Sequence, residues 1–541
     1  MPVAITEAEV LIVGGGPVGL TARALLERWG VRALLVEKHG ELSPFPRSRL
    51  VNVRSMEIFR GLGLAAGITA NAFAPEYGRV RFRGTLHDRD YATAAMVGVN
   101  APVPESPVIG VVTSQDRLEP ALLGAADAPV RFGVELIGLA EEADGVVARL
   151  FDRGRGEETR VRARYVLAAD GANSTVRGLL GIGTAGPGAL GDFTTVLFDA
   201  DFGRSRAPEP AGVYFTPYGS IGPLYPEGGW AWFGPTPDSP SPADWTDLVS
   251  RALGPGAGVR PDVLRVQHWV MNAFVAERLR HGRTLLAGDA AHAVPPIGGL
   301  GMNTGIADVH NLCWKLAGVV HGWATPGLLE TYRAEREPVA HLTLGQAVAN
   351  SRLLMDVQNR LREQLRTGEA TSGPVELPWS ERYFAQLGLV LGVAYRSAAV
   401  LADGDAPPPP PDHGTRPSDG VAPPEPPEPP GEGADYVPTA EPGHRMPHLW
   451  LSRDRSTIDA FGEWFTLFTR DPADRLGPAA GFWPLRIETL RDAHPGLCGL
   501  GPHGALLVRP DGHIAARWRD RAPSESTLRR ALTAITRSVP S

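Results

Sequence analysis

Three stretches of the chain combine glycines with a carboxylate in a spacing that suits a phosphorylated cofactor. The first stretch, GGGPVG, places Gly14, Gly16 and Gly19 in a G-x-G-x-x-G pattern directly after the apolar run 10–13. In such a turn the first glycine permits the tight bend and the second lets the backbone approach a pyrophosphate. The third glycine lets the following helix pack closely on the strand. The pattern therefore predicts a nucleotide phosphate at this turn.

The residues that follow supply the context that this motif requires. Residues 21–29 are rich in Ala, Leu, Arg and Glu and predict a helix, and residues 33–36 predict a second buried strand that ends in Glu37. A carboxylate at that strand end can accept hydrogen bonds from ribose hydroxyls. Strand, helix, strand and acid in this order predict an adenine dinucleotide site. At this point FAD and NAD(P) both remain open.

The second stretch is YVLAADGANSTVRGLLGI, residues 165–182. An apolar strand ends at Asp170, and a turn with Ser174 and Arg177 leads into a helix. We expect Asp170 to order a loop near the cofactor and Arg177 to meet a phosphate.

The third stretch is GRTLLAGDAAHAVPPIGGLGMNTGIADVHNLCWKL, residues 282–316. An apolar strand ends at Gly288 and Asp289, where a carboxylate can bind a polyol chain. Prolines and glycines then keep the chain extended up to a helix predicted to begin near Asn303. The N–H groups and partial positive charge of that helix start would stabilise an anionic ring system. His292 is predicted to be a packed structural residue.

Composition excludes several classes of protein. The 541 residues carry a net charge of −7, whereas a nucleic-acid binder would be basic. The two cysteines, Cys313 and Cys498, form no C-x-x-C motif, so cysteine-ligated metals and structural disulfides are not expected. The N-terminus lacks the basic region of a signal peptide, and no apolar run approaches the roughly 18 residues of a membrane span. We expect a cytoplasmic protein that binds neither nucleic acid nor membrane.

Two further regions differ in composition. Residues 403–436 are proline-rich and acidic, which predicts a linker without a core. The region around 188–275 alternates aromatic and small residues, which predicts antiparallel strands with one face towards something flat and apolar. Its aromatic side chains could line a substrate pocket or belong to the core, and the three chosen as substrate candidates are Tyr214, Tyr225 and Trp232.

In this order, the three motifs resemble the single-component FAD-dependent aromatic hydroxylases, the group A flavoprotein monooxygenases with the para-hydroxybenzoate hydroxylase fold. PRSRLVNVRSMEIFRGLGL (46–64) is similar to the arginine-bearing loop of that family, and SQDRLEPALL (114–123) to its Q-x-x-L-E-x-x-L helix. PGHRMPHLWL (442–451) and LLVRPDGHIAARW (506–518) look like the C-terminal thioredoxin-like domain of longer members. Those members include phenol hydroxylases and hydroxylases of bacterial aromatic polyketides.

The resemblance implies an α/β fold in which a Rossmann-like FAD-binding domain carries an inserted β-sheet substrate domain, followed by a thioredoxin-like α/β domain without C-x-x-C. The expected units are a discontinuous FAD-binding domain (1–75, 103–187 and 276–340), the substrate domain (76–102 and 188–275), a helical segment (341–402), the linker (403–436) and the last domain (437–541). Two departures from the family pattern are an unusually long proline-rich insert and Asp308-Val309-His310-Asn311-Leu312, where the family reads D-A-x-N-L.

The resemblance also implies the cofactor contacts. Arg47 would lie near the flavin, although Arg49 and Arg54 are alternatives, and Gln115 would contact the cofactor or cap its helix. The residues expected to bind the cofactor are Gly14, Gly16, Pro17, Gly19, Glu37, Arg47, Gln115, Asp170, Gly288, Asp289, Gly299, Leu300, Gly301, Met302 and Asn303. The residues expected at the flavin edge and oxygen pocket are Pro296, Gly299, Leu300 and Gly301. No catalytic side chain and no metal ligand set is assigned.

The implied reaction is hydroxylation of a polycyclic aromatic compound, a polyketide by resemblance, with NAD(P)H and O₂ through a flavin C4a-hydroperoxide. A second G-x-G-x-x-G after a strand is missing, so NAD(P)H would visit without a fold of its own. Baeyer–Villiger or quinone-forming oxygenation on the same platform remains an alternative. So do an NAD-linked dehydrogenase and a non-catalytic flavin-binding scaffold. A homodimer is left open.

Overall fold

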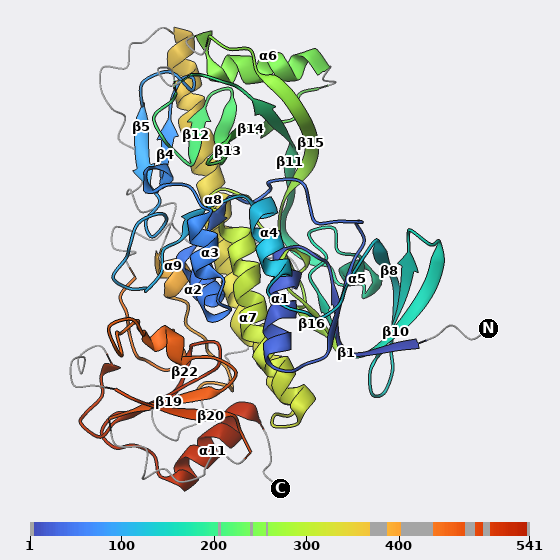
Figure 1. The fold of residues 1–541 in the computed structure, drawn as a ribbon, viewed down its shortest axis with the longest axis vertical. Helices are drawn as coiled ribbons and strands as arrows, with labels where there is room; N and C mark the ends of the chain where they lie inside the picture. The colour runs from blue at the N-terminus through green and yellow to red at the C-terminus, as the bar shows by residue number, and fades with distance from the viewer. Residues whose placement is uncertain are drawn as a thin grey trace, which may run out of the picture.

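The computed structural model describes residues 5–203, 207–238, 242–255, 258–367, 387–401, 436–470, 482–490 and 498–537 (Figure 1). The predicted linker 403–436 lies outside the described residues except for Tyr436, which is buried.

An eight-stranded sheet forms the first layer, with β1 (Ile5–Val13) between β2 (Ala33–Glu37) and β10 (Glu157–Ala168), all parallel. The apolar run 10–13 is fully buried because helices and neighbouring strands cover this part of the sheet. The helix after the first glycine turn is α1 (Pro17–Arg28), which begins earlier than the predicted residue 21 because proline suits the first helical position. The other strands are β7 (Val130–Phe132), β8 (Val134–Glu141), β9 (Val146–Asp152), β16 (Arg280–His281) and β17 (Thr284–Leu286).

A second eight-stranded sheet has the order β18-β15-β11-β14-β13-β12-β4-β5. Its strands are β4 (Arg79–Phe82), β5 (Ala92–Ala95), β11 (Thr184–Asp199), β12 (Val213–Thr216), β13 (Gly219–Tyr225), β14 (Gly228–Pro235), β15 (Asp262–Ala276) and β18 (His292–Ala293). The face covered by α6 (Pro242–Leu253) is called the outer face here, and the face covered by α8 (Glu330–Thr367) the inner face. Figure 1 shows α6 at one end of the molecule and α8 running from the second sheet towards the centre.

Further short strands and helices complete this part of the chain, and several of them carry the site. They are β3 (Leu50–Val51), α2 (Val53–Gly61), α3 (Ala65–Ala70), β6 (Val111–Val112), α4 (Gln115–Leu123), α5 (Thr175–Leu179), α7 (Leu300–His321) and α9 (Leu387–Leu391). Short 3₁₀ turns are Pro75–Tyr77, Gly288–Ala290, Pro326–Leu329 and Thr457–Ala460. α7 is buried along most of its length and crosses the centre of the molecule (Figure 1). Within the described residues, no helix is both long and apolar enough to cross a bilayer.

The last domain is a four-stranded sheet in the order β20-β19-β21-β22, with α11 (Glu525–Thr536) packed on it. The strands are β19 (Phe465–Thr469), β20 (Leu485–Thr489), β21 (Ala505–Val508) and β22 (Ile514–Trp518). Its core continues into that of the first layer, because the ring of Phe465 lies edge-on to Trp314 and Trp323 at 5.7 and 6.1 Å between centroids. The domain is therefore packed into the rest of the chain and is not a separate unit.

Candidate active site

The three glycine-and-carboxylate turns lie against one another in the structure. A Cβ on Gly14 would overlap the carbonyl of Ala169, so the first turn packs on the second. A Cβ on Gly305 of α7 would lie 2.6 Å from the Val18 side chain and 2.8 Å from the Cα of Gly288. The third motif therefore packs on α1, and glycine at these positions permits the close approach.

The first turn presents open space and backbone donors. Gly16 is the N-cap of α1, and among the residues that the structure describes no side chain caps the helix and no atom lies within 4 Å of where a Cβ on Gly16 would be. The first N–H groups of α1 therefore face outward, as an anion site requires. Glu37 accepts a hydrogen bond from the Gly15 N–H at 2.6 Å and a second from the His39 N–H at 2.8 Å. These bonds hold the Glu37 carboxylate at the turn, where a ribose would lie.

The arginine-bearing loop divides its three arginines between different tasks. Arg54 is buried, and its guanidinium group donates to the carboxylate of Glu57 at 2.9 Å and to the carbonyl of Asp511 at 2.8 Å. Arg49 turns towards the second sheet and donates to the carbonyl of Pro223 at 2.7 Å. Arg47 is exposed and is near enough to Asp289 to lower the pKa of that carboxyl in part. Arg47 is thus the arginine of the three that lies at the meeting point of the turns.

Asp289 faces this meeting point with a free carboxylate. Among the described residues it has no hydrogen-bond partner, and solvent reaches it. Protein nevertheless surrounds it on its other sides, and this loss of hydration raises the pKa of Asp289, while His292 and Arg47 oppose the shift. An open carboxylate with unused acceptors fits a hydroxyl-bearing ligand such as a ribityl chain.

The helix of the third motif begins at Leu300, three residues before the predicted Asn303. Gly299 caps it in the left-handed region, with φ 64°, and no side chain from the described part of the chain caps its first N–H groups. The donors at this helix start are therefore those of Leu300, Gly301 and Met302. A Cβ on Gly299 would lie 2.5 Å from Leu50, so glycine is required both for its φ and for this contact.

Asn303 has a different task from the one predicted. Its side-chain amide donates to the carbonyls of Leu50 at 2.9 Å and Gly299 at 2.7 Å, and its oxygen accepts from the Asn52 N–H at 2.9 Å. Asn303 thus joins α7 to the arginine-bearing loop. Because its side chain is buried and used in these bonds, it fixes the start of α7 against this loop.

The second motif orders its own loop, as predicted for Asp170. This carboxylate accepts from Ser174 Oγ at 2.6 Å and from the Val176 N–H at 3.0 Å. Arg177, expected to meet a phosphate, instead donates to the carbonyls of Ala172 and Ala290 at 2.6 and 3.0 Å.

Gln115 and Pro296 complete the set of predicted residues. Gln115 is the first residue of α4, and its side-chain amide donates to Glu119 at 2.7 Å. Pro296 accepts from the Gly299 N–H at 3.0 Å and so closes the turn before α7.

Two of the three aromatic substrate candidates are corrected by the structure. Tyr214 and Trp232 are buried on the outer face, in the cluster that packs on Trp245 and Val249 of α6. They lie on the far side of the sheet from α8 and cannot touch a ligand at the turns. Tyr225 is partly buried, donates to Asp116 at 2.6 Å, and stays a candidate.

The inner face presents other side chains that the sequence reasoning missed. Phe233 pairs across the sheet with Thr195, and Thr195 with Gln267. Successive side chains of a strand point to opposite faces, so these residues face inward because Trp232 and Val196 face outward. Because side chains alternate between the two faces of a strand, one residue of known orientation would have been enough to find these three. The sequence does not give that orientation, because it does not show which face a helix covers.

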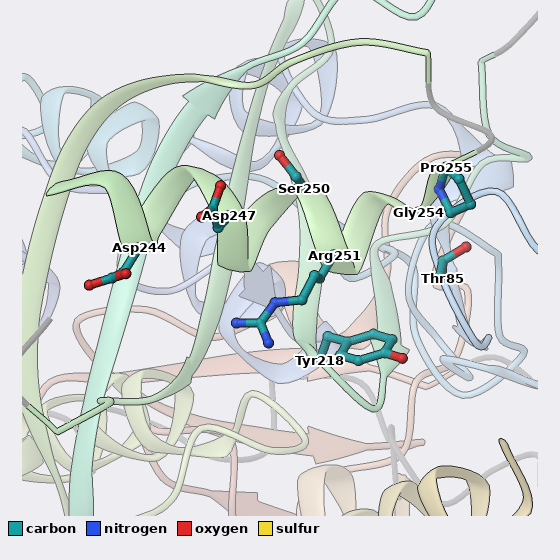
Figure 2. A pocket seen from close by; sticks show the side chains of 8 residues that line it. All are labelled: Thr85, Tyr218, Asp244, Asp247, Ser250, Arg251, Gly254 and Pro255. Carbon is teal, nitrogen blue, oxygen red and sulfur yellow. The ribbon is translucent and has the colours of Figure 1, made fainter. Parts of the chain in front are cut away.

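A surface hollow of about 640 Å³ lies elsewhere, along α6 (Figure 2). Figure 2 shows Asp244, Asp247, Ser250 and Arg251 on one helix, with Tyr218 beneath Arg251. This hollow is wide open to solvent, belongs to the outer face, and shares no residue with the glycine turns. It is not part of the candidate site.

A buried group of charges supports the third turn, and Asp308 of α7 is its centre. Asp308 accepts from the Gly288 N–H at 3.0 Å, from His292 Nε2 at 2.7 Å and from Arg336 Nε at 2.7 Å. Burial alone would raise the pKa of Asp308, but His292 and Arg336 lower it to about 2. His292 is packed, as predicted; the supporting roles of Asp308 and Arg336 were missed because nothing local in the sequence pairs residues on two helices.

Comparison of the sequence with known proteins finds relatives over most of the chain. The FAD binding domain family matches residues 7–347, and the aromatic-ring hydroxylase C-terminal family matches residues 439–537. Aklavinone 12-hydroxylase DnrF of Streptomyces peucetius is 35% identical over 511 residues, which cover 89% of this chain and 93% of that protein. A putative polyketide hydroxylase of Streptomyces halstedii is 34% identical over 580 residues, with 97% and 96% covered.

A solved structure shows the same fold. The flavin-dependent monooxygenase PieE, in complex with FAD and substrate, superposes with a TM-score of 0.81 at 30% identity, and the match covers 99% of both chains. The chain therefore belongs to the FAD-dependent aromatic-ring hydroxylases and is a flavin-dependent monooxygenase. The open Gly16 turn, the pinned Glu37 and the free Asp289 carboxylate fit FAD as its cofactor.

Proposed function

We propose that this protein hydroxylates a phenolic ring of a polycyclic aromatic polyketide, using NAD(P)H and O₂. The observation that carries the proposal is the meeting of the three turns beside the inner face of the second sheet. That face offers partly buried Phe233, Thr195 and Gln267 to a flat ligand. The names of the relatives support a polyketide, and the partly buried ring of Phe233 on the inner face supports a flat ring system.

FAD bound at the turns would supply the redox chemistry, namely hydride acceptance from NAD(P)H and activation of O₂. One oxygen atom enters the ring and the other leaves as water, so each turnover uses one NAD(P)H, one proton and one O₂. The chain itself binds and orients the reactants.

The positions of the side chains suggest how the chain does this. Glu37 would hold the adenosine ribose and Asp289 the ribityl chain. The first N–H groups of α1 would meet the pyrophosphate, with Arg47 beside it. The N–H groups and partial positive charge at the start of α7 would stabilise negative charge on the ring system of the cofactor.

The test is turnover of the full-length protein, loaded with FAD, on a panel of hydroxylated anthraquinones and tetracyclic phenols under isotope-labelled O₂. We expect NADPH or NADH to be consumed, and the product to carry one labelled oxygen on an intact carbon skeleton. A ring-expanded lactone would indicate Baeyer–Villiger oxygenation instead. Hydride transfer without O₂ uptake would indicate a dehydrogenase, and bound FAD that no nicotinamide reduces would indicate a scaffold.

We further propose a cytoplasmic location and leave the homodimer as a prediction for light scattering. Both cysteines are free and buried, which suits a reducing compartment.

A further inference from the structure

Arg49 lies where the arginine-bearing loop crosses the inner face of the second sheet. Its guanidinium group rests directly on Gly222 of β13, where any Cβ would collide with both terminal nitrogens. The next residue, Leu50, contacts Gly299 at the start of α7. Arg49 is therefore held between the turn assigned to the flavin edge and the sheet assigned to the substrate.

The guanidinium group of Arg49 makes few hydrogen bonds to the described residues. One terminal nitrogen donates to the Pro223 carbonyl at 2.7 Å, and within the described residues no carboxylate pairs with it. By contrast, the buried Arg336, Arg445 and Arg509 each pair with a carboxylate. A guanidinium group has five N–H donors, so most of those of Arg49 remain available.

Arg49 is only partly buried, but its guanidinium group lies against an apolar part of the sheet. Gly222 pairs across the sheet with Ala231, and the adjoining Leu197 and Leu224 are buried in one apolar cluster. Loss of hydration lowers the pKa of Arg49 to about 10, so it is still a cation at neutral pH. A cation in such a place is stabilised by an anion that arrives with the ligand.

We propose that Arg49, with its guanidinium group seated on Gly222, binds an anionic oxygen of the aromatic substrate, a phenolate or a carboxylate. Glycine at position 222 is then a specificity feature, because it makes room for the guanidinium group. The inference rests on the proposed function and narrows its substrate class to aromatic compounds that carry an ionised oxygen.

The test compares three anthraquinone probes on the FAD-loaded full-length protein. They are 1,8-dihydroxyanthraquinone, its 3-carboxylic acid, and the 1,8-dimethoxy ether, which cannot ionise. Binding is measured by the change in flavin absorption on titration. The variants are Arg49→Gln, Arg49→Lys and Gly222→Ala, with Arg265→Gln as the matched control, because Arg265 is an exposed cation that lies over Phe45 near the same face.

We expect Arg49→Gln to raise the Kd of at least one ionisable probe about tenfold or more, the size of one charge-assisted hydrogen bond. The Kd of the dimethoxy ether and the Kd of FAD should stay as in the wild type. Arg49→Lys should restore part of the affinity, and Gly222→Ala should reproduce the loss by displacing the guanidinium group. The probe that responds tells whether the phenolate or the carboxylate is bound.

Equal loss for the ionisable probes and the ether, or loss of FAD affinity alone, would overturn the inference and assign Arg49 to packing or to the cofactor. A wild type that hydroxylates the probes without dependence on Arg49 would overturn this inference only. Binding that depends on Arg49 without any hydroxylation would support it and overturn the proposed function. A wild type that binds none of the three would overturn both.

Discussion

Asp289 and Glu37 are both carboxylates at strand ends, yet the structure treats them differently. Glu37 is fixed by the N–H groups of Gly15 and His39, whereas Asp289 accepts no hydrogen bond from the described residues. A free acceptor beside Arg47 gains most from a ligand that donates, because its hydration is already incomplete. At the scale of single residues, we therefore expect FAD binding to depend strongly on the Asp289 carboxylate.

Asp289→Ala should weaken FAD binding about tenfold to a hundredfold, since a hydrogen bond to a charged group contributes about 1.5–3 kcal/mol. The measurement is a fluorescence titration of the apoprotein with FAD, together with the flavin content after gel filtration. Asp247→Ala, in the hollow along α6, is the control and should bind FAD as the wild type does. Unchanged FAD affinity in Asp289→Ala would refute its assignment.

At the scale of elements, α7 links the cofactor site to the buried charges. Its first turn carries the free N–H groups, Asn303 joins it to the arginine-bearing loop, and Asp308 lies beneath Gly288. Arg336 of α8 holds the other oxygen of Asp308. The position of the third turn therefore depends on the packing of two helices and not on its glycines alone.

Asp308→Asn should lower the free energy of unfolding by about 3–5 kcal/mol, because it leaves Arg336 buried without its anion. FAD affinity should fall as well, since the Gly288 N–H is less firmly held. The checks are urea unfolding and FAD titration, with the exposed Asp144→Asn as a control. Wild-type stability in Asp308→Asn would contradict the supporting role.

The same carboxylate predicts a pH dependence. The pKa of Asp308 is lowered to about 2 in the folded protein, against about 3.9 for an unfolded aspartate. Its contribution, about 3 kcal/mol, is therefore present above pH ~4 and is lost as the pH falls through 2. The Asp308→Asn variant should lose less stability than the wild type across that interval.

At the scale of the whole molecule, the last domain closes a buried cluster of charges. Arg509 of that domain donates to both oxygens of Glu335 on α8, at 2.6 and 2.9 Å. Lys315 of α7 donates to Glu335 at 2.7 Å, and Trp314 Nε1 to Asp511 at 3.2 Å. These residues are almost fully buried, so the cluster is satisfied only when the domains are packed together.

Arg509→Met should therefore destabilise the whole chain by about 3–5 kcal/mol, because it leaves Glu335 and Asp511 short of a cation. Unfolding in urea followed by far-UV circular dichroism and by flavin fluorescence should show one coincident transition, since the core is shared. Arg529→Met, an exposed arginine of α11, is the control. Two separate transitions would mean that the last domain folds independently.

The local sequence determined the cofactor turns. Glycine spacing, apolar runs and strand-end acids act over a few residues, so β1, α1, β2 and Glu37 were predictable, as was the α/β class. The starts of helices were harder to predict. α7 begins at Leu300 because Gly299 adopts the left-handed conformation, and helix propensities do not show which of several glycines will do so.

Tertiary structure alone decided which side of a strand is covered and which distant groups meet. Tyr214 and Trp232 belong to the core because α6 covers their face, and Arg49 meets Gly222 across more than 170 residues of chain. The pairing of Asp308 with Arg336 and of Glu335 with Arg509 likewise depends on where helices and domains dock. The physical reason is that turns form from neighbouring residues, whereas burial and charge pairing are set by contacts that no local pattern encodes.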